Sequence, residues 1–325
     1  MAQKKQRRRK ILSIPGLMHM INLDQYNRIR LAREPLGQRI VGSVLLTSNY
    51  RFFADVDVSV ENLERIPQNE TVIFAMNHTD RYNYWPFQWK LWREKSFPFT
   101  TVWVKGKYYR NRMLGKFFDW CRLIPVPSMG YLVEELYRNN FKKKIDPNEY
   151  RIIKDLIDGK QHLSDALKKL TPETASMLKD NFVEFIKGYH DALMNRVAEL
   201  SRKALFETNL NVIIFPEGTR SLKLGEGRTG LAQLALHTEK KIVPVGCNNS
   251  EEVYQGHLPF AKSGKVVYRI GEPLTVQDQL KEYRIRENFT LFSPESRIKY
   301  REQFEAVTAK VMESINRVVD EKYRR

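Results

Sequence analysis

The stretch MNHTDRYNYWP at residues 76–86 holds a side chain with the chemistry of a catalytic base. His78 follows a strand-like run, TVIFA at 71–75, at the point where we expect strand to give way to helix. A neutral imidazole titrates near neutral pH and can take a proton from a hydroxyl group. We therefore treat His78 as a candidate general base and ask which group orients its ring.

Two residues close to His78 are candidates for that orienting role. Asn83 can accept the ring N–H through its amide oxygen, but an amide cannot balance the charge of the imidazolium. In serine proteases, Asn in place of the orienting Asp costs about 10⁴ in turnover. Asp80 could curl back to the ring if residues 79 and 80 form the turn before the helix. Alternatively, Asp80 is an N-cap or first-turn acid of that helix and needs no catalytic role.

A second stretch, NVIIFPEGTRS at 211–221, has the composition of an anion-binding turn. A hydrophobic strand runs into a proline and then into Glu217, Gly218, Thr219 and Arg220. Arginine presents a planar fork of N–H donors that fits a phosphate group in bidentate fashion. Many turns contain Gly and Arg, so this stretch gains its weight from the strand-terminal histidine upstream.

These strings together resemble the glycerolipid acyltransferases, whose best-known members are the 1-acylglycerol-3-phosphate acyltransferases. The dipeptide NH at 77–78, FPEGTRS at 215–221 and IVPVG at 242–246 look like three of the four sequence blocks of that family, in the right order. The resemblance extends over roughly residues 56–128 and 200–275. It implies a glycerol-3-phosphate acyltransferase-like fold.

The resemblance also implies a reaction. A fatty acyl group would pass from a thioester on CoA or acyl carrier protein to a hydroxyl of a lysophospholipid-type acceptor, 1-acylglycerol-3-phosphate above all. His78 matches the histidine that deprotonates the acceptor hydroxyl in that family. Glu217, Gly218, Thr219 and Arg220 match the block that binds the phosphate-bearing acceptor. No cofactor beyond the acyl donor, and no metal, is implied.

Two positions depart from the family pattern. Asn83 stands where the family has the aspartate that orients the histidine. In the remaining block, at 104–128, Lys105 is present, but Ser128 stands where the family usually has an arginine. Arg122 is a candidate to supply the missing positive charge, as are Arg110 and Arg112. Equally, the acceptor could differ from the usual phosphate-bearing lysolipid.

The positive charge of the chain is concentrated near its start. The net charge is +17, and residues 1–50 hold ten Lys or Arg against two acids. Six of the ten lie in KKQRRRK at 4–10, followed directly by ILSIPGLMHMINL at 11–23. A basic run suits anionic lipid headgroups, nucleic acid, an acidic protein or a solvated tail. The adjoining apolar segment favours a lipid surface, so we expect peripheral attachment to the inner, cytoplasmic face of a membrane.

Several other classes of function find no support. Neither apolar stretch, 11–23 or 40–47, approaches the roughly 20 residues that cross a bilayer, and no secretory cleavage site follows the first. Cys121 and Cys247 have no metal-like spacing and are expected to be reduced thiols. The string GEGRTG at 225–230 matches a dinucleotide-binding pattern but does not directly follow a strand, so we expect it instead to lead into a helix.

The order of elements predicts an α/β fold with a mixed, largely parallel sheet flanked by helices. We expect strands near 71–76, 100–104, 210–215, 241–247 and 265–270. Residues from about 130 to 195 predict a helical insertion of two or three helices, with start signals at Asp146 and Thr171. The aromatic residues after His78 could line an acyl channel, lie at the membrane interface or fill the core: Tyr82, Tyr84, Trp85, Phe87, Trp89 and Trp92.

The predicted domain organisation has three parts. Residues 1–55 form a basic membrane-associating segment, 56–275 an acyltransferase domain that carries the insertion, and 276–325 end in an amphipathic helix packed on that domain. Its buried stripe is expected at Phe304, Val307, Val311, Ile315 and Val318.

Two alternatives to an active acyltransferase remain. The first is a catalytically impaired relative that binds lipid or acyl carrier protein, which Asn83 would explain. The second is a basic nucleic-acid-binding protein, but no nucleic-acid-binding motif accompanies the charge, and we expect no nucleic-acid partner.

Overall fold

The structure is a computed structural model that describes residues 23–178, 181–256 and 258–325. The basic run at 4–10 and the apolar residues 11–22, on which the predicted membrane contact chiefly depends, lie outside the described residues. The chain divides into two compact units. The helical unit comprises residues 1–29, 105–111 and 125–197, and the sheet unit comprises residues 30–104, 112–124 and 198–325.

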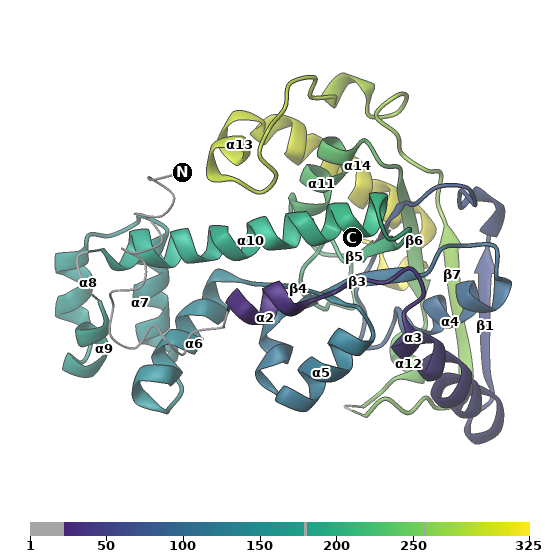
Figure 1. The fold of residues 1–325 in the computed structure, drawn as a ribbon, viewed down its shortest axis with the longest axis horizontal. Coiled ribbons are helices and arrows are strands. Elements are labelled where there is room, and N and C mark those ends of the chain that lie inside the picture. The colour runs from purple at the N-terminus through teal and green to yellow at the C-terminus, as the bar shows by residue number, and fades with distance from the viewer. Residues whose placement is uncertain (1–22, 179–180, 257) are drawn as a thin grey trace. The chain divides into compact units, whose positions relative to one another are not determined.

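Within the described residues, seven strands form one sheet in the order β1-β7-β6-β2-β5-β3-β4 (Figure 1). Their bounds are β1 Val56–Glu61, β2 Ile73–Met76, β3 Thr100–Lys105, β4 Ile124–Val126, β5 Asn211–Ile214, β6 Ile242–Asn248 and β7 Gly264–Ile270. β2 lies between β5 and β6 and is parallel to both, β3 is parallel to β5, and β1 is parallel to β7. Only the pairing of β6 with β7 is antiparallel among these. The predicted mixed, largely parallel α/β sheet is therefore confirmed, including the five expected strands.

The strands β1 and β4 are absent from the prediction. In β1, Val56 and Val58 are buried between the exposed or half-buried Asp57 and Ser59, so the strict alternation of a half-buried strand was present as a signal. β4 has only three residues, and its central Pro125 argues against a strand. It lies at the edge of the sheet, where a proline removes no bond from a central ladder.

Helices cover both faces of the central strands. On one face, Phe74 and Met76 of β2 pack in a core with α4 (Trp85–Glu94). On the other face lie α11 (Gly230–Thr238) and α14 (Arg301–Val318) (Figure 1). Gly246 of β6 permits this second layer, because a Cβ there would lie 2.3 Å from the carbonyl oxygen of Val318. Two tightly packed layers thus fix the central strands.

The helical unit contains more helices than the prediction had. They are α2 (Leu23–Arg28), α6 (Met129–Phe141), α7 (Pro147–Ile157), α8 (Leu163–Lys169), α9 (Pro172–Met177) and the first part of α10 (Phe182–Phe206). Both predicted start signals are confirmed, because Asp146 accepts the N–H of Asn148 and Thr171 accepts that of Thr174 at the respective N-caps. The six and seven residues of α9 and α8 are too short to show a clear helical period.

The predicted C-terminal helix is divided into two. α13 (Pro294–Lys299) is separated from α14 by Tyr300, whose backbone leaves the helical region at φ −113° and ψ 29°. The predicted buried stripe is confirmed at Phe304, Val307, Val311 and Ile315. Val318 is only half-buried, and Val319 takes its place in the core.

The segment before β1 is helical and unusually apolar on its surface. It contains α3 (Leu36–Ile40) and two π-helical turns, η2 (Val41–Leu46) and η3 (Asn49–Phe53). Its exposed apolar side chains are Leu36, Ile40, Val44, Phe52 and Phe53. The other α-helices described in the sheet unit include α5 (Arg112–Trp120) and α12 (Ser250–Val253), and short 3₁₀ turns lie at Leu63–Arg65, Lys281–Tyr283 and Glu321–Tyr323. Across the described residues, none of the helices combines the length and the apolar character that a bilayer crossing needs.

Candidate active site

His78 lies just beyond the carboxyl end of β2, in the loop that leads to α4. In open α/β sheets this edge is where ligands bind. Because β2 and β5 are parallel neighbours, their two following loops meet there. The imidazole stacks on the ring of Phe215, which follows β5, with centroids 4.1 Å apart and 19° between the planes. The two sequence blocks that were quoted for their chemistry are therefore in direct contact.

Asn77 fixes the backbone next to His78. Its amide Nδ2 donates to the carbonyl oxygen of Cys247 at 2.9 Å, and its Oδ1 accepts the N–H of Cys247 at 2.7 Å. Cys247 belongs to β6, the other neighbour of β2. The side-chain amide of Asn77 thus pairs with the backbone of β6 as the main chain of a neighbouring strand would.

Glu217 holds His78 from the other side. The carboxylate is 4% exposed; Oε1 accepts the backbone N–H of His78 at 2.9 Å and Oε2 accepts that of Gly225 at 2.7 Å. The N–H of Ser221 also donates to the carbonyl oxygen of His78 at 2.9 Å. Burial raises the pKa of Glu217, while the two N–H donors and the positive charge of Arg325 oppose that rise. Glu217 therefore organises the loop of the histidine.

The turn after Glu217 presents groups suited to an anion. Gly218 has a φ of +68°, a left-handed conformation that glycine adopts without strain. Thr219 and Arg220 follow and are exposed. Arg228, which the sequence analysis did not single out, packs against this turn: its Nε lies 3.4 Å from the carbonyl oxygen of Glu217. A Cβ at Gly218 would come within 2.9 Å of that same Nε.

Asp80 is engaged within its own turn. Its Oδ1 accepts the backbone N–H of Tyr82 at 2.7 Å, and Oδ2 accepts the hydroxyl of Thr79 at 3.1 Å. The residue is 7% exposed, and burial raises the pKa of its carboxyl, an effect that the hydrogen bond from the N–H of Tyr82 opposes. Asp80 thus stabilises its own turn, but the expectation that it caps the following helix is wrong: the N-cap of α4 is Tyr84, and its first turn contains no acid.

Asn83 reaches the histidine loop through the main chain. It is fully buried, and its Nδ2 donates to the carbonyl oxygen of Asn77 at 2.7 Å. Its Oδ1 is buried and has no hydrogen-bond partner within the part of the chain that is described. The backbone oxygen of Asn83 accepts the hydroxyl of Tyr268 at 2.5 Å. An amide suits this place, because a carboxylate could not donate to the Asn77 carbonyl.

The basic residues of the block at 104–128 have other contacts. Arg122 has a φ of +60°, and its Nη1 donates to the carbonyl oxygen of Arg30 at 2.9 Å. Arg110 pairs with Glu135 within the helical unit. Lys105 is exposed at the end of β3 and is assigned to the helical unit. The structure therefore does not bring Arg122 to the turn of Glu217 through any contact that it shows.

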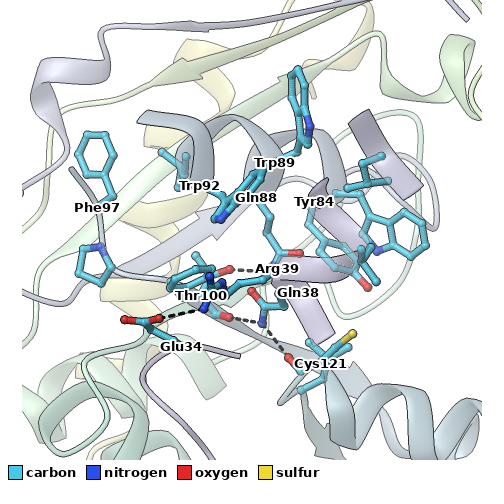
Figure 2. Close-up of a pocket in the computed structure, with 18 of the residues that line it drawn as sticks. Glu34, Gln38, Arg39, Tyr84, Gln88, Trp89, Trp92, Phe97, Thr100 and Cys121 are labelled. Carbon is cyan, nitrogen blue, oxygen red and sulfur yellow. Dashed lines mark hydrogen bonds and ion pairs between the residues drawn. The ribbon is translucent and has the colours of Figure 1, made fainter. Parts of the chain in front are cut away.

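A cavity of about 390 Å³ lies beside this site in the sheet unit (Figure 2). Tyr84 lines it, and the ring of Tyr84 is 6.1 Å from that of Phe215, on which His78 stacks. Much of the wall is aromatic or apolar: Tyr84, Trp85, Trp89, Trp92, Phe97, Phe99 and Phe117. Four of the six aromatic residues after His78 thus line the cavity, whereas Phe87 packs in the core against Phe74 and Tyr268.

Polar side chains hold part of the cavity wall in shape. The amide Nε2 of Gln38 donates to the carbonyl oxygens of Thr100 and Cys121, at 2.7 Å each (Figure 2). Gln88 donates to the hydroxyl of Thr100 at 2.5 Å. Cys121 is a free, buried thiol, as is Cys247, and burial raises the pKa of Cys121 to about 12. No group of three or more His, Cys, Asp or Glu arranged for a metal ion occurs among the residues with a described position.

Comparison with known proteins gives three findings. Residues 166–248 match the family model described as Acyltransferase, a range that contains the turn of Glu217 and all of β6 but not His78. No curated protein matches the chain. Among solved structures, the chain is similar to the crystal structure of the 1-acyl-sn-glycerophosphate acyltransferase PlsC from Thermotoga maritima, with 16% identity, a TM-score of 0.40, and coverage of 89% of this chain and 86% of that chain.

The family match falls on the stretch whose strand ends in the anion-suited turn, and the sheet places that turn against the histidine of the NH dipeptide. Residues 166–248 of this chain are therefore similar to the acyltransferase family.

Proposed function

We propose that the chain transfers a fatty acyl group from the thioester of acyl-CoA or acyl carrier protein to a hydroxyl of a lysophospholipid-type acceptor, 1-acylglycerol-3-phosphate above all. One observation carries the proposal: the backbone N–H and the carbonyl of His78 are both hydrogen-bonded to the Glu217–Ser221 turn. A general base and an anion-suited turn are thereby held as one unit.

His78 is the general base in this proposal. Its Nδ1 is buried, so Nε2 is the ring nitrogen that an acceptor hydroxyl would approach. Nε2 takes the hydroxyl proton as the oxygen attacks the thioester carbonyl carbon. The tetrahedral intermediate collapses, the C–S bond breaks, and the thiolate takes the proton from the imidazolium. The products are an ester and a free thiol, so atoms and charges balance.

The acceptor phosphate is assigned to the turn after Glu217. Arg220 is exposed there, and Arg228 packs beside Gly218, so two guanidinium groups accompany the turn. Within the described residues, neither arginine forms an ion pair with an acid. Such unneutralised guanidinium groups can bind a phosphate dianion in place of its water shell.

The acyl chain is assigned to the cavity beside Tyr84. Its volume of about 390 Å³ lies within the range of ordinary ligand pockets. Its lining is largely aromatic and aliphatic, which suits a hydrocarbon chain. The ring of Tyr84 connects the cavity to the Phe215–His78 stack, so a chain in the cavity would have its thioester end near the base.

We further propose that the enzyme works as a peripheral protein on an anionic membrane surface, on its cytoplasmic face. Phe52 and Phe53 are 81% and 83% exposed, and Leu36 and Val44 of the same segment are also exposed. Arg51 lies beside these phenylalanines. Exposed aromatic side chains next to positive charge are typical of interfacial binding.

Acyl transfer is tested with the purified full chain, labelled acyl-CoA or acyl carrier protein, and a panel of lysolipids. We expect lysophosphatidate to be acylated and His78→Ala to lose about 10²- to 10⁴-fold in turnover, the range for general-base catalysis. His162→Ala, at an exposed position of the helical unit, is the matched control. Transfer that survives His78→Ala contradicts the proposal. Acceptor binding by a wild-type chain that acylates none of these lysolipids supports the catalytically impaired alternative instead.

Membrane binding is tested separately by flotation with vesicles. We expect the full chain to bind vesicles containing phosphatidylglycerol and Phe52→Ser/Phe53→Ser to bind less. A variant with the lysines and arginines of residues 4–10 exchanged for glutamine tests the basic run independently. Equal binding by wild type and the Phe52/Phe53 variant would remove this segment from the membrane contact.

A further inference from the structure

The loop at residues 224–227 has no assigned contact with the reacting atoms or the acceptor phosphate, yet three other segments pack against it or hydrogen-bond to it: Glu217, α14 and residues 323–325. Gly225 donates its N–H to Glu217, as described above. Gly227 lies against α14, where a Cβ would come within 2.6 Å of the Thr308 side chain and 2.7 Å of that of Met312. This is the start of the string that resembled a nucleotide-binding loop. Its glycines are explained here by close packing.

The third side of this loop is formed by residues 323–325. The N–H of Leu224 donates to the carbonyl oxygen of Tyr323 at 2.8 Å. The guanidinium of Arg325 donates from Nε to the carbonyl oxygen of Gly225 at 3.1 Å, and its Nη2 contacts that same oxygen. Nε of Arg325 also lies 3.4 Å from the carbonyl oxygen of Leu224. Residues 323–325 therefore bind the loop through its main chain and are independent of its side chains.

The segment that grips the loop is itself anchored. Tyr323 is fully buried, and its hydroxyl accepts the N–H of Asn249 at 2.7 Å and donates to Glu251 at 2.6 Å. Asp320 donates its N–H to the side-chain oxygen of Asn248 at 2.7 Å. Asn248 ends β6, the strand whose Cys247 pairs with Asn77. Residues 320–325 and the histidine loop are thus both hydrogen-bonded to the end of the same central strand, β6.

We propose that Arg325 and Tyr323 are positioning residues for the proposed base, acting through a relay of main-chain contacts. The relay runs from Arg325 to Gly225, from Gly225 to Oε2 of Glu217, and from Oε1 of Glu217 to the N–H of His78. Arg325 also places a positive charge close enough to influence the Glu217 carboxylate. Neither residue touches the reacting atoms. The catalytic part of this inference rests on the proposed function.

The relay predicts that the effects of substitutions at Arg325 and Glu217 on kcat are not additive. If Arg325 acts only by fixing Glu217, its removal should matter little once Glu217 is already impaired. Residues that act in one network give non-additive effects, whereas independent residues give additive ones. A residue that merely stabilises the fold would lower the melting temperature without this dependence on Glu217.

The test compares Arg325→Ala with Arg324→Ala in the full chain. Both substitutions remove one positive charge from exposed neighbours, but Arg324 donates to the carbonyl of Val319 and does not contact the loop. We expect Arg325→Ala to lower kcat about tenfold, the factor that about 1.4 kcal/mol represents, with the KM for the acyl donor unchanged. Arg324→Ala should retain wild-type kcat. In the Glu217→Gln background, Arg325→Ala should change kcat by less than about twofold, the limit within which independent effects usually add.

A second measurement does not depend on activity. Hydrogen exchange of the Gly225 and His78 amides should accelerate in Arg325→Ala and stay unchanged in Arg324→Ala. Arg325→Lys, which keeps the charge but has fewer donors, should be intermediate and serves if the alanine variant does not fold. Unchanged exchange, faster exchange with unchanged kcat, or a full tenfold effect in the Glu217→Gln background would each overturn the relay. A wild-type chain without transferase activity would refute the proposed function, while the exchange data would still decide the relay.

Discussion

The turn that contains Asp80 and the turn that contains Glu217 both bury a carboxylate beside His78, but they use it in opposite ways. Asp80 is 7% exposed and Glu217 is 4% exposed, and burial raises the pKa of both. The carboxylate oxygens of Asp80 accept hydrogen bonds from Thr79 and Tyr82, its close neighbours in sequence. Glu217 joins His78, 139 residues away, to Gly225.

From this difference we expect the proposed site to depend more on the Glu217 carboxylate than on that of Asp80. A carboxylate that caps its own turn stabilises one short segment. A carboxylate that bridges separate segments fixes their relative positions, and that is what a base and an acceptor site require of their scaffold. The carboxylate that supports the backbone of His78 is therefore that of Glu217, across the sheet, rather than that of Asp80, two residues along the chain.

Among these substitutions, Glu217→Gln should have the largest effect on kcat. Glutamine keeps the shape, but its NH₂ group would face one of the two backbone donors. A buried donor left without an acceptor costs about 1–3 kcal/mol, and we expect kcat to fall about 10²-fold, equal to about 2.7 kcal/mol. Denaturant unfolding and steady-state kinetics measure the two effects. The exposed Glu226→Gln, in the same loop, is the control, and wild-type kcat in Glu217→Gln would refute the role of the bridge.

Asn83→Asp introduces the residue that the resembling family has at this position. Here it would place a carboxylate where Nδ2 now donates to the Asn77 carbonyl, in a fully buried environment. We expect the melting temperature to fall by several degrees, as a loss of about 1–3 kcal/mol implies, and kcat to fall about tenfold. Asn148→Asp, exposed at the start of α7, is the control. A rise in kcat would instead mean that the new carboxylate orients the imidazole.

Arg228→Ala sharpens the comparison on the acceptor side of the Glu217 turn. Removal of one guanidinium from a phosphate site should raise the KM for lysophosphatidate by about tenfold, since a charged hydrogen bond contributes about 1.5–3 kcal/mol. The KM for an uncharged monoacylglycerol should stay the same. Lys223→Ala, also exposed nearby, is the control. Equal changes for both acceptors would exclude a specific contact with the phosphate.

Asp80→Asn should have the smallest effect on activity, within about threefold and so below the 1.4 kcal/mol of a tenfold change. Its effect should appear in stability against pH. Because burial raises the pKa of Asp80, the folded chain holds this proton more firmly than the unfolded chain does. Stability is therefore lost as pH rises from about 4, near the unfolded pKa, through the folded pKa. Asparagine cannot ionise, so this loss should disappear.

Melting temperatures between pH 4 and pH 8 measure that difference, with the exposed Asp278→Asn as the control. Identical pH dependence in wild type and Asp80→Asn would contradict the buried ionised state. A fall in kcat of about 10⁴, the cost of losing an orienting Asp in a triad, would restore Asp80 as the partner of the imidazole.

The sequence was sufficient to predict the α/β class and five of the seven strands described, because buried strands leave strong local patterns. It linked His78 and the turn of Glu217 only through the family resemblance, and the parallel pairing of β2 with β5 is what brings their loops together. The contacts between Glu217, Gly225 and Arg325 could not be predicted in this way. They depend on the exact approach of segments far apart in sequence, for which no periodic pattern exists.

The contacts of Arg228 and Asn83 likewise could not be predicted from the sequence. Arg228 lies in a string whose spacing matches a nucleotide-binding pattern, and only its position against Gly218 shows that it neighbours the Glu217 turn. Asn83 was compared with an aspartate that binds a ring, yet its amide donates to the main chain. A residue type limits which hydrogen bonds are possible, and the surrounding fold selects among them.

The pairing of β1 with β7 has a consequence for how the chain is made. Val56 lies opposite Gly264, so β1 cannot pair with β7 until all the other strands described in the sheet have been synthesised. Contacts between such distant residues slow folding and leave strand edges open in the meantime. Ribosome-arrested chains of graded length should accordingly aggregate or bind chaperones when they end before residue 264, and this tendency should disappear only once both β7 and the covering helix α14 have emerged.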